Sequence, residues 1–306
     1  MGQKLYDEEP TFRETILACD EEVRRQLGWS LAEEFTRNKK DYRLHRVEGH
    51  IQPAATALQM ALAALFSERG IEPAAVAGLS MGEVAAVHLA GVFDLSDSIR
   101  VVSGQSKVTE SKMRPGRMAY VGLGAREVRT LASEYSGGVA VAVELSRSTT
   151  VVSGEAGALG GFLALLGKKG VRFGLVNVGF AFHGPEVSAL RPRFIAQLQG
   201  LRLNPESVPV YSSVSGRRQA GQGFDDGYWW RVMSEPALFS TLVYNLLQDG
   251  YRTFVEFGPH PMLTQSILEE AKSIKKEVVV FSTMRRDGDE RLVLEETLRS
   301  LGELAR

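Results

Sequence analysis

The chain contains very little cysteine and no sign of a membrane segment. Cys19 is the only cysteine among 306 residues, so neither an internal disulfide nor a cysteine-based metal site can form. No apolar run approaches the roughly 20 residues that a membrane span needs. The first twenty residues are mixed and acidic and lack the apolar core of a signal peptide. These absences predict a cytoplasmic protein with no membrane partner.

An excess of positive charge is also missing. The chain has 36 Lys and Arg against 37 Asp and Glu, for a formal net charge of -1. This balance argues against a nucleic-acid partner and against a charged interaction tail. With 44% hydrophobic and 24% charged residues, the composition is typical of a globular protein. The length suggests two domains, or one large domain with an insertion.

A candidate nucleophile follows a short apolar strand. Residues 74–77 lead into Gly78-Leu79-Ser80-Met81-Gly82, and alanine-rich helical sequence follows. A G-x-S-x-G turn between a strand and a helix exposes a serine hydroxyl, and its glycines relieve crowding at a strained backbone. The backbone N–H of Met81 would then be free to donate to an oxyanion. The alternative is an ordinary glycine turn before a helix.

A serine nucleophile needs a base to remove its proton. The histidines are His45, His50, His88, His183 and His260. His88 lies about two turns into the helix after Ser80 and should point away, whereas His45 and His50 fall in a predicted polar loop over 41–50. His183 follows an apolar strand and sits in a Gly-Phe-Ala-Phe-His-Gly-Pro turn. His183 is therefore the predicted base.

A lipase-type Ser-Asp-His triad fits this chain poorly. In that arrangement the acid lies between the serine and a late histidine, but no aspartate occurs between Asp97 and His183. A Ser80–His183 dyad fits better, with the imidazole oriented by a group other than a carboxylate. The segment 256–261 is a candidate source of a backbone carbonyl for that purpose.

The order of elements predicts an α/β fold with an insertion. Residues 117–178 have the pattern β-α-β-β-α-β of a ferredoxin-like unit, between the two parts of a larger core, 1–116 and 179–306. The other expected elements are two helical pieces in 1–50, helices over 53–70, about 94–102, 185–198, 235–248 and from 288, and strands at 208–216 and 253–258.

Several segments together resemble a known family. In order, they are Ile51–Ala54, Gly78–Glu83, Ala181-Phe182-His183, Tyr211–Gly216, Trp229-Trp230, Phe254–Leu263 and Met284–Asp287. The chain resembles the malonyl-CoA:acyl-carrier-protein transacylases, in particular the acyltransferase domains of polyketide synthases. The resemblance implies an α/β-hydrolase-like core with a ferredoxin-like subdomain. It also implies ping-pong chemistry: the serine takes an acyl group from a thioester of CoA or a carrier protein, and the phosphopantetheine thiol of an acyl carrier protein collects it, with no bound cofactor or metal.

One departure from the family bears on the substrate. Members that accept malonyl or methylmalonyl groups carry an arginine, which binds the free carboxylate, at the position of Gln105. A neutral amide cannot balance a buried carboxylate. The expected acyl group therefore has no terminal carboxylate. Two alternatives stay open: Lys107 replaces the arginine, or Gln105 is a neutral change in a malonyl enzyme.

Other predicted substrate contacts also come from the resemblance. Leu79 replaces the family's usual histidine and would make the acyl pocket more apolar. Phe182 matches the aromatic variant of the family's motif before the histidine. Both could simply be core residues. Gln52 would lie near the active site or would hydrogen-bond a helix N-terminus. The pairs Arg217-Arg218 and Arg285-Arg286 could contact phosphate or an acidic carrier protein, or could be solvated surface residues.

The family also opens with a strand and a glycine-glutamine loop of the form FPGQGSQ. Residues 1–6 of this chain resemble the sequence just after that loop. The resemblance therefore predicts a chain that is shortened relative to the family, or impaired, without the loop glutamine that helps to bind the oxyanion.

Three functions are compatible with these features. The first is transfer of a non-carboxylated acyl group to an acyl carrier protein, in polyketide or fatty-acid-like biosynthesis. The second is a hydrolase that clears acyl groups from carrier proteins. The third is a docking module without catalytic activity.

Overall fold

A computed structural model describes residues 2–37, 48–112, 115–135 and 137–304. The helices are α1 (Gln3–Glu8), α2 (Pro10–Leu27), α3 (Leu31–Thr36), α4 (Glu48–Glu68), α5 (Gly82–Leu89), α6 (Leu95–Lys112), α7 (Ala125–Glu134), α8 (Ala156–Lys168), α9 (Arg191–Leu198), α10 (Asp226–Ser234), α11 (Phe239–Gln248), α12 (Thr264–Ser273) and α13 (Glu290–Leu304), with 3-10 turns η2 (Pro185–Leu190) and η3 (Gly221–Gly223). The strands are β1 (Val76–Ala77), β2 (Arg117–Val121), β3 (Ala140–Glu144), β4 (Thr150–Gly154), β5 (Phe173–Val176), β6 (Val210–Tyr211), β7 (Arg218–Gln219), β8 (Thr253–Glu256) and β9 (Val279–Ser282).

Helix α4 forms the centre of the N-terminal half and packs against α2, α5 and α6. Its alanine and leucine side chains, such as Ala57, Ala61 and Leu62, are fully buried, and both residue types favour helices. The helix begins before Pro53, so the predicted loop over 41–50 is wrong for residues 48–50, while 38–47 lie outside the described residues. Stacking of His50 on Trp29, with ring centroids 3.9 Å apart, supports the early turn.

Helix α6 is longer than predicted. It continues past Val102 to Lys112, so Gly104 lies inside the helix rather than at its end. A Cβ at Gly104 would lie 3.2 Å from Cβ of Gln197 and 3.5 Å from Phe194 on α9. The glycine therefore allows two helices to approach closely, and that long-range contact extends α6 beyond Gln105.

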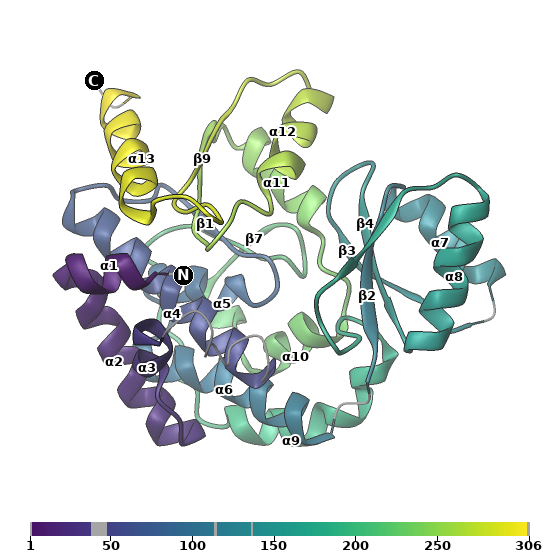
Figure 1. The fold of residues 1–306 in the computed structure, drawn as a ribbon, viewed down its shortest axis with the longest axis horizontal. Helices are drawn as coiled ribbons and strands as arrows, with labels where there is room; N and C mark the ends of the chain where they lie inside the picture. Colours follow the sequence, from purple (N-terminus) through teal and green to yellow (C-terminus); the bar gives the residue numbers. More distant parts are fainter. Residues whose placement is uncertain (1, 38–47, 113–114, 136, 305–306) are drawn as a thin grey trace.

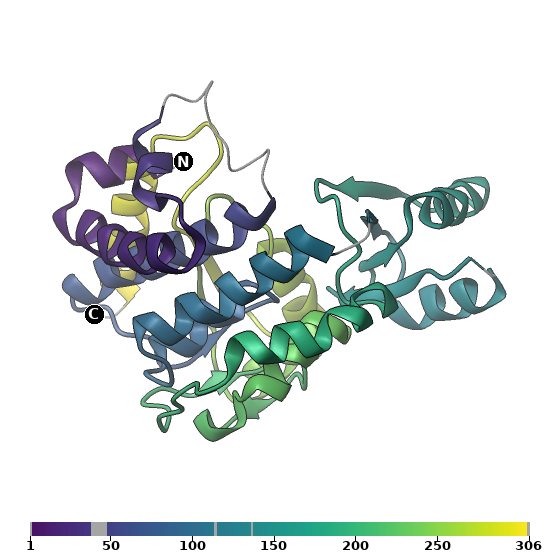
Figure 2. The same cartoon turned by 90° about the horizontal axis from the view of Figure 1, so that it is seen from below.

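Residues 117–176 form the predicted β-α-β-β-α-β unit. Strands β2 to β5 make one antiparallel sheet in the order β3-β4-β2-β5. Helices α7 and α8 cover one face of this sheet, on the side turned away from the rest of the chain (Figures 1 and 2). Their contact with the sheet buries apolar side chains, including Val121, Val128 and Phe162.

The opposite face of that sheet packs on the larger part of the chain. Met118 and Val143 share a buried cluster with Phe239 and Leu242 of α11. The two connections to the sheet are themselves paired, because Pro115 bridges Phe180 and the N–H of Gly116 donates to Gly179 O at 2.9 Å. The boundaries of the two predicted domains, 1–116 with 179–306 and 117–178, stay a prediction.

The remaining strands are short and form separate sheets. Strands β1 and β6 pair in parallel, and β7 pairs antiparallel with the other edge of β6. Parallel strands β8 and β9 form a second sheet. The sequence patterns did not predict α10, α12 or β9, and α11 begins at Phe239 rather than at residue 235. Among the described residues, no helix is long and apolar enough to cross a membrane.

Candidate active site

The serine turn predicted from the sequence is a strained elbow. Strand β1 ends at Ala77 and α5 begins at Gly82, with Ser80 between them at a φ of 52°. A residue other than glycine rarely adopts this left-handed conformation, and it costs roughly 1–3 kcal/mol. The surrounding structure must therefore hold Ser80 in place. Such strained serine turns expose the hydroxyl at the start of a helix.

Gly78 permits the elbow to close. A Cβ at this position would lie 2.3 Å from both N and Cα of Glu83, and these backbone atoms cannot move without opening the turn. We expect Gly78→Ala to lower the free energy of unfolding by at least about 1–3 kcal/mol, as overpacking does, and to slow acylation of Ser80. Urea unfolding measures the first effect.

Gly160 offers a matched control for this substitution. It lies inside α8, and a Cβ there would meet nothing within 4 Å. Gly160→Ala should therefore stabilise the chain by about 0.5–1 kcal/mol through helix propensity. Equal unfolding midpoints for the two variants would contradict the close packing at Gly78.

The structure brings His183 to the serine. Ser80 Oγ lies 2.9 Å from His183 Nε2, although 103 residues separate them in sequence. His183 also has a positive φ of 57°. Its backbone N–H donates to Met233 O at 3.0 Å, and its Nδ1 lies 2.9 Å from Glu235 O. Two backbone carbonyls at the end of α10 therefore hold this histidine.

The orienting carbonyl is not the one expected from the sequence. The candidate segment 256–261 does not hold the imidazole, and Phe257 O instead accepts Gln59 Nε2 at 3.2 Å. The sequence patterns missed Glu235 because α10, which positions it, was not predicted. Helix α10 packs against η2, the turn after His183, and the carbonyl of Glu235 at its end lies beside the imidazole.

Burial sets the charge of the imidazole. His183 is 4% exposed, and this desolvation lowers its pKa, although the contact with Glu235 O opposes the shift. The ring is thus neutral at pH 7. Because a carbonyl can only accept, Nδ1 carries the proton and Nε2 presents a lone pair to Ser80.

The backbone N–H of Met81 is free, as the sequence motif predicts. The N–H groups of Gly82 and Glu83 donate to Leu79 O and Ser80 O, each at 3.0 Å. No acceptor for the Met81 N–H occurs among the described residues. This donor at the start of α5 adjoins the serine, where an oxyanion would form.

A buried carboxylate beneath the elbow escaped the sequence analysis. Glu83 is fully buried, and its oxygens accept hydrogen bonds from Ser213 and Tyr228. Burial raises the pKa of Glu83 to about 7, although those hydrogen bonds oppose the shift. A signal was present in the sequence, since the charged residue directly after G-x-S-x-G lies at the start of a helix whose other residues, apart from His88, are apolar or glycine.

Of the predicted pocket residues, Gln105 is buried, whereas Leu79, Phe182 and Gln52 are partly buried. Leu79 and Phe182 pack on the same apolar cluster. Gln105 is 3% exposed on α6. Its Oε1 and that of Gln52 are buried with no hydrogen-bond partner in the described structure. Gln52 lies inside α4, so its carbonyl oxygen does not cap the helix.

A cavity of about 440 Å³ adjoins the histidine on the side of the antiparallel sheet. It is lined by His183, Gly184 and Pro185, by Val139 to Val141, and by Arg129 and Ser133 of α7, among others. Arg129 is the cationic group among the described residues of this lining, and it forms an ion pair with Glu144. Its charge is already balanced.

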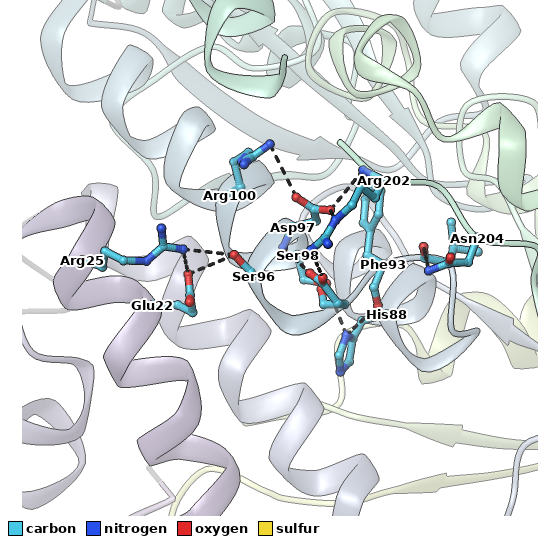
Figure 3. A network of polar contacts seen from close by, with 12 residues as sticks. Glu22, Arg25, His88, Phe93, Ser96, Asp97, Ser98, Arg100, Arg202 and Asn204 are labelled. Carbon is cyan, nitrogen blue, oxygen red and sulfur yellow. Dashed lines mark hydrogen bonds and ion pairs between the residues drawn. The ribbon is translucent and has the colours of Figure 1, made fainter. Parts of the chain in front are cut away.

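The other described histidines lie elsewhere. His88 Nδ1 contacts Phe93 O at 3.2 Å and Ser98 Oγ at 3.3 Å, beyond the far end of α5. Figure 3 shows it beside the ion pairs of Asp97 with Arg100 and Arg202. His260 Nδ1 accepts the N–H of Arg286 at 3.3 Å, and His45 lies outside the described residues.

The candidate surface cations are exposed. Arg217, Arg218, Arg285 and Arg286 are all exposed, and Arg218 lies 3.7 Å from Glu206. Lys107 is exposed on α6, whereas Gln105 is buried, so the two side chains lie on different faces of the helix. No group of three metal-ligating side chains occurs in the ranges that the structure describes.

A strained serine paired with a neutral histidine is the arrangement of enzymes that form an acyl-serine. A family model described as acyl transferase domain matches residues 1–305. The chain belongs to this family. It is 35% identical over 307 aligned residues to the spectinabilin polyketide synthase system protein NorA' of Streptomyces orinoci, covering 99% of this chain and 8% of that protein. It thus spans a small part of such relatives.

Solved structures agree with this assignment. A loading acyltransferase from the avermectin modular polyketide synthase matches with a TM-score of 0.92 and 33% identity, over 98% of this chain and 95% of that one. The acyl transferase domain of SpnD, in complex with 2-(pent-4-yn-1-yl)malonyl, matches with a TM-score of 0.87 and 26% identity, over 98% and 72%. The predicted family and fold class are confirmed.

Proposed function

We propose that this domain transfers a non-carboxylated acyl group from a thioester to an acyl carrier protein through an acyl-Ser80 intermediate. The observation that carries the proposal is the 2.9 Å contact between Ser80 Oγ and His183 Nε2. Because the histidine is neutral and its Nδ1–H is held by Glu235 O, Nε2 is the nitrogen able to accept the serine proton.

The first half-reaction loads the serine. As Ser80 Oγ attacks the thioester carbonyl carbon, its proton moves to His183 Nε2. The carbonyl oxygen becomes an oxyanion, which the Met81 N–H stabilises. When the tetrahedral species collapses, the C–S bond breaks and the imidazolium returns its proton to the departing thiolate. The products are acyl-Ser80 and a free thiol.

The second half-reaction runs the same steps in reverse on a new thiol. The phosphopantetheine thiol gives its proton to His183 Nε2, and its sulfur attacks the Ser80 ester. The C–O bond breaks, and Ser80 Oγ recovers the proton from the imidazolium. Glu235 O accepts from Nδ1–H throughout, and this contact stabilises the positive charge that the ring carries in each half-reaction.

The choice of a neutral acyl group rests on Gln105. Its amide is buried and uncharged, and an unpaired buried carboxylate costs several kcal/mol. Among the described residues that line the cavity beside His183, Arg129 is the cation, and it is already paired with Glu144. The apolar side chains of Leu79 and Phe182, which share one cluster, suit an uncharged chain.

The proposed division of the chain follows the same arrangement. Residues 1–116 and 179–306 would form the catalytic core, and 117–178 the inserted subdomain. The paired connections at Pro115 and Phe180 support this boundary. The cavity beside His183, lined from both parts, would lie at their junction.

Loading and release can be tested together. The chain is incubated with propionyl-CoA and a phosphopantetheinylated carrier protein, and the acyl group is followed by intact mass. Acyl-carrier product is the expected result. Free propionate without acyl-carrier product would identify a hydrolase. The absence of any adduct on Ser80 would indicate a docking module.

A further inference from the structure

The buried carboxylate of Glu83 has no part in the proton transfers described above, yet three donors converge on it. Ser213 N–H donates to Oε1 at 3.0 Å, Ser213 Oγ–H donates to Oε2, and the Tyr228 hydroxyl donates to Oε1. A carboxylate that accepts three hydrogen bonds is matched to its ionised form, because a protonated acid would present a donor to one of these donors. The site is therefore built around a negative charge.

Glu83 belongs to α5, the helix that directly follows the nucleophile Ser80. It is the second residue of α5, and its N–H donates to Ser80 O at 3.0 Å. Its backbone also contacts Gly78, where a Cβ would lie 2.3 Å from its Cα. Any shift of Glu83 is thus transmitted directly to the elbow.

Tyr228 belongs to the helix that holds the histidine. It lies in the first turn of α10, and the residues at the end of the same helix, Met233 and Glu235, supply the carbonyls that fix His183. Since the single hydroxyl proton of Tyr228 goes to Glu83, its oxygen accepts from Ser212 Oγ, 2.7 Å away. The Glu83–Tyr228 contact therefore joins the nucleophile helix to the histidine-holding helix inside the core.

We propose that Glu83 is a positioning residue, whose ionised carboxylate holds α5 against α10 through Tyr228 and Ser213 and thereby sets the Ser80–His183 contact. This role rests on the proposed function of the Ser80–His183 pair. The reaction needs near-contact geometry, and a misplacement of about 1 Å can cost about 10²-fold in rate.

The ionisation of Glu83 is expected to make acylation depend on pH. Two groups face Glu83: Ser213, from the segment after β6, and Tyr228, from α10. The positive charge of Arg231, also on α10, opposes the rise in the pKa of Tyr228. Gln59 of α4, which is uncharged, lies near the neighbouring Gly82. Burial raises the pKa of Glu83 to about 7, so the ionised clamp is complete above that pH and is lost below it. His183, with its lowered pKa, protonates at more acidic pH. Acylation should therefore fall in two successive steps as the pH drops.

Glu83→Gln is the direct test. Single-turnover acylation by propionyl-CoA is measured from pH 5.5 to pH 9 by intact mass. At pH 8 the saturating rate should fall by about 10- to 100-fold, with little change in the propionyl-CoA concentration that gives half of that rate. The step near pH 7 should disappear, leaving the single step of His183. A folded variant with the original rate and both steps would overturn the positioning role.

Tyr228→Phe keeps the test decisive if Glu83→Gln does not fold. Losing one donor disfavours the carboxylate, so the upper step should move to higher pH. An unmoved step would refute the role of Glu83. Glu270→Gln serves as a control, because Glu270 is a buried carboxylate on α12 that pairs with Arg147 and accepts a hydrogen bond from Ser240 of α11. It should change the unfolding midpoint and leave both steps in place.

The two proposals fail in different ways. If the unsubstituted chain forms no propionyl adduct on Ser80 at any pH, the proposed function is wrong and the positioning role falls with it. If the adduct forms normally and the Glu83 variant matches it in rate and pH profile, the positioning role alone is wrong.

Discussion

Ser80→Ala is expected to abolish the acyl adduct. The hydroxyl supplies the attacking oxygen, and no other group within reach of His183 Nε2 replaces it among the described contacts. Removal of a serine nucleophile costs about 10⁶-fold in a well-studied hydrolase, so acyl transfer should fall to background. Intact mass after incubation with propionyl-CoA measures the adduct, and transfer to a carrier protein measures turnover.

Ser98→Ala is the matched control for that experiment. Ser98 is a buried serine that, like Ser80, contacts a histidine, and it donates to Asp94 O at 2.8 Å, but it lies near His88 and away from the elbow. Its variant should load normally. An adduct of full stoichiometry on the Ser80 variant would place the nucleophile elsewhere.

His183→Asn should retain Ser80 yet load it far more slowly, because a dyad acts as a unit.

Gln105→Arg is expected to reverse the acyl preference. A guanidinium in place of the amide would pair with a malonyl carboxylate in a bidentate contact. It would also disfavour a propionyl group, which leaves the buried cation unpaired. The ratio of malonyl-CoA to propionyl-CoA loading rates should rise by about 10²-fold, equivalent to about 2.7 kcal/mol. Competition between the two thioesters, read by the mass of the adduct, gives this ratio.

Two further variants make the Gln105 experiment decisive. Gln105→Met removes the amide without adding charge and should keep the preference for propionyl. If the unsubstituted chain already loads malonyl faster than propionyl, the neutral acyl group is the wrong substrate class. In that case Arg129→Ala tests whether Arg129, which lines the cavity beside His183, gives up its ion pair with Glu144 and binds the malonyl carboxylate instead. Slower malonyl loading by this variant would show that it does.

Local patterns were informative where short segments determine structure. The G-x-S-x-G turn between β1 and α5 needs glycines for steric reasons that act within a few residues, and Gly78 meets Glu83 as such a turn requires. The alternation of strands and helices over 117–178 likewise followed from apolar periodicity and agrees with the sheet of β2 to β5. His183 could be selected from the histidines because its neighbours are apolar, glycine or proline.

Local sequence patterns could not predict contacts between segments that are distant in the sequence. Helix α10 was missed because its nine residues, DGYWWRVMS, include aromatic and β-branched residues with modest helix propensity. With α10 unknown, neither the carbonyl of Glu235 nor the hydroxyl of Tyr228 could be assigned. The early start of α4 and the extension of α6 past Gly104 depend on neighbours such as Trp29 and Phe194.

The sequence by itself determined the family, the strand-elbow-helix that presents Ser80, and the identity of the histidine and of the uncharged residue at 105. Tertiary structure alone decided which atoms meet: His183 with Ser80, Glu235 O with the imidazole, and Glu83 with Tyr228. The physical reason is range. Backbone strain and periodicity act over a few residues, whereas these hydrogen bonds join residues 52 to 145 positions apart, and they form only after the core has packed.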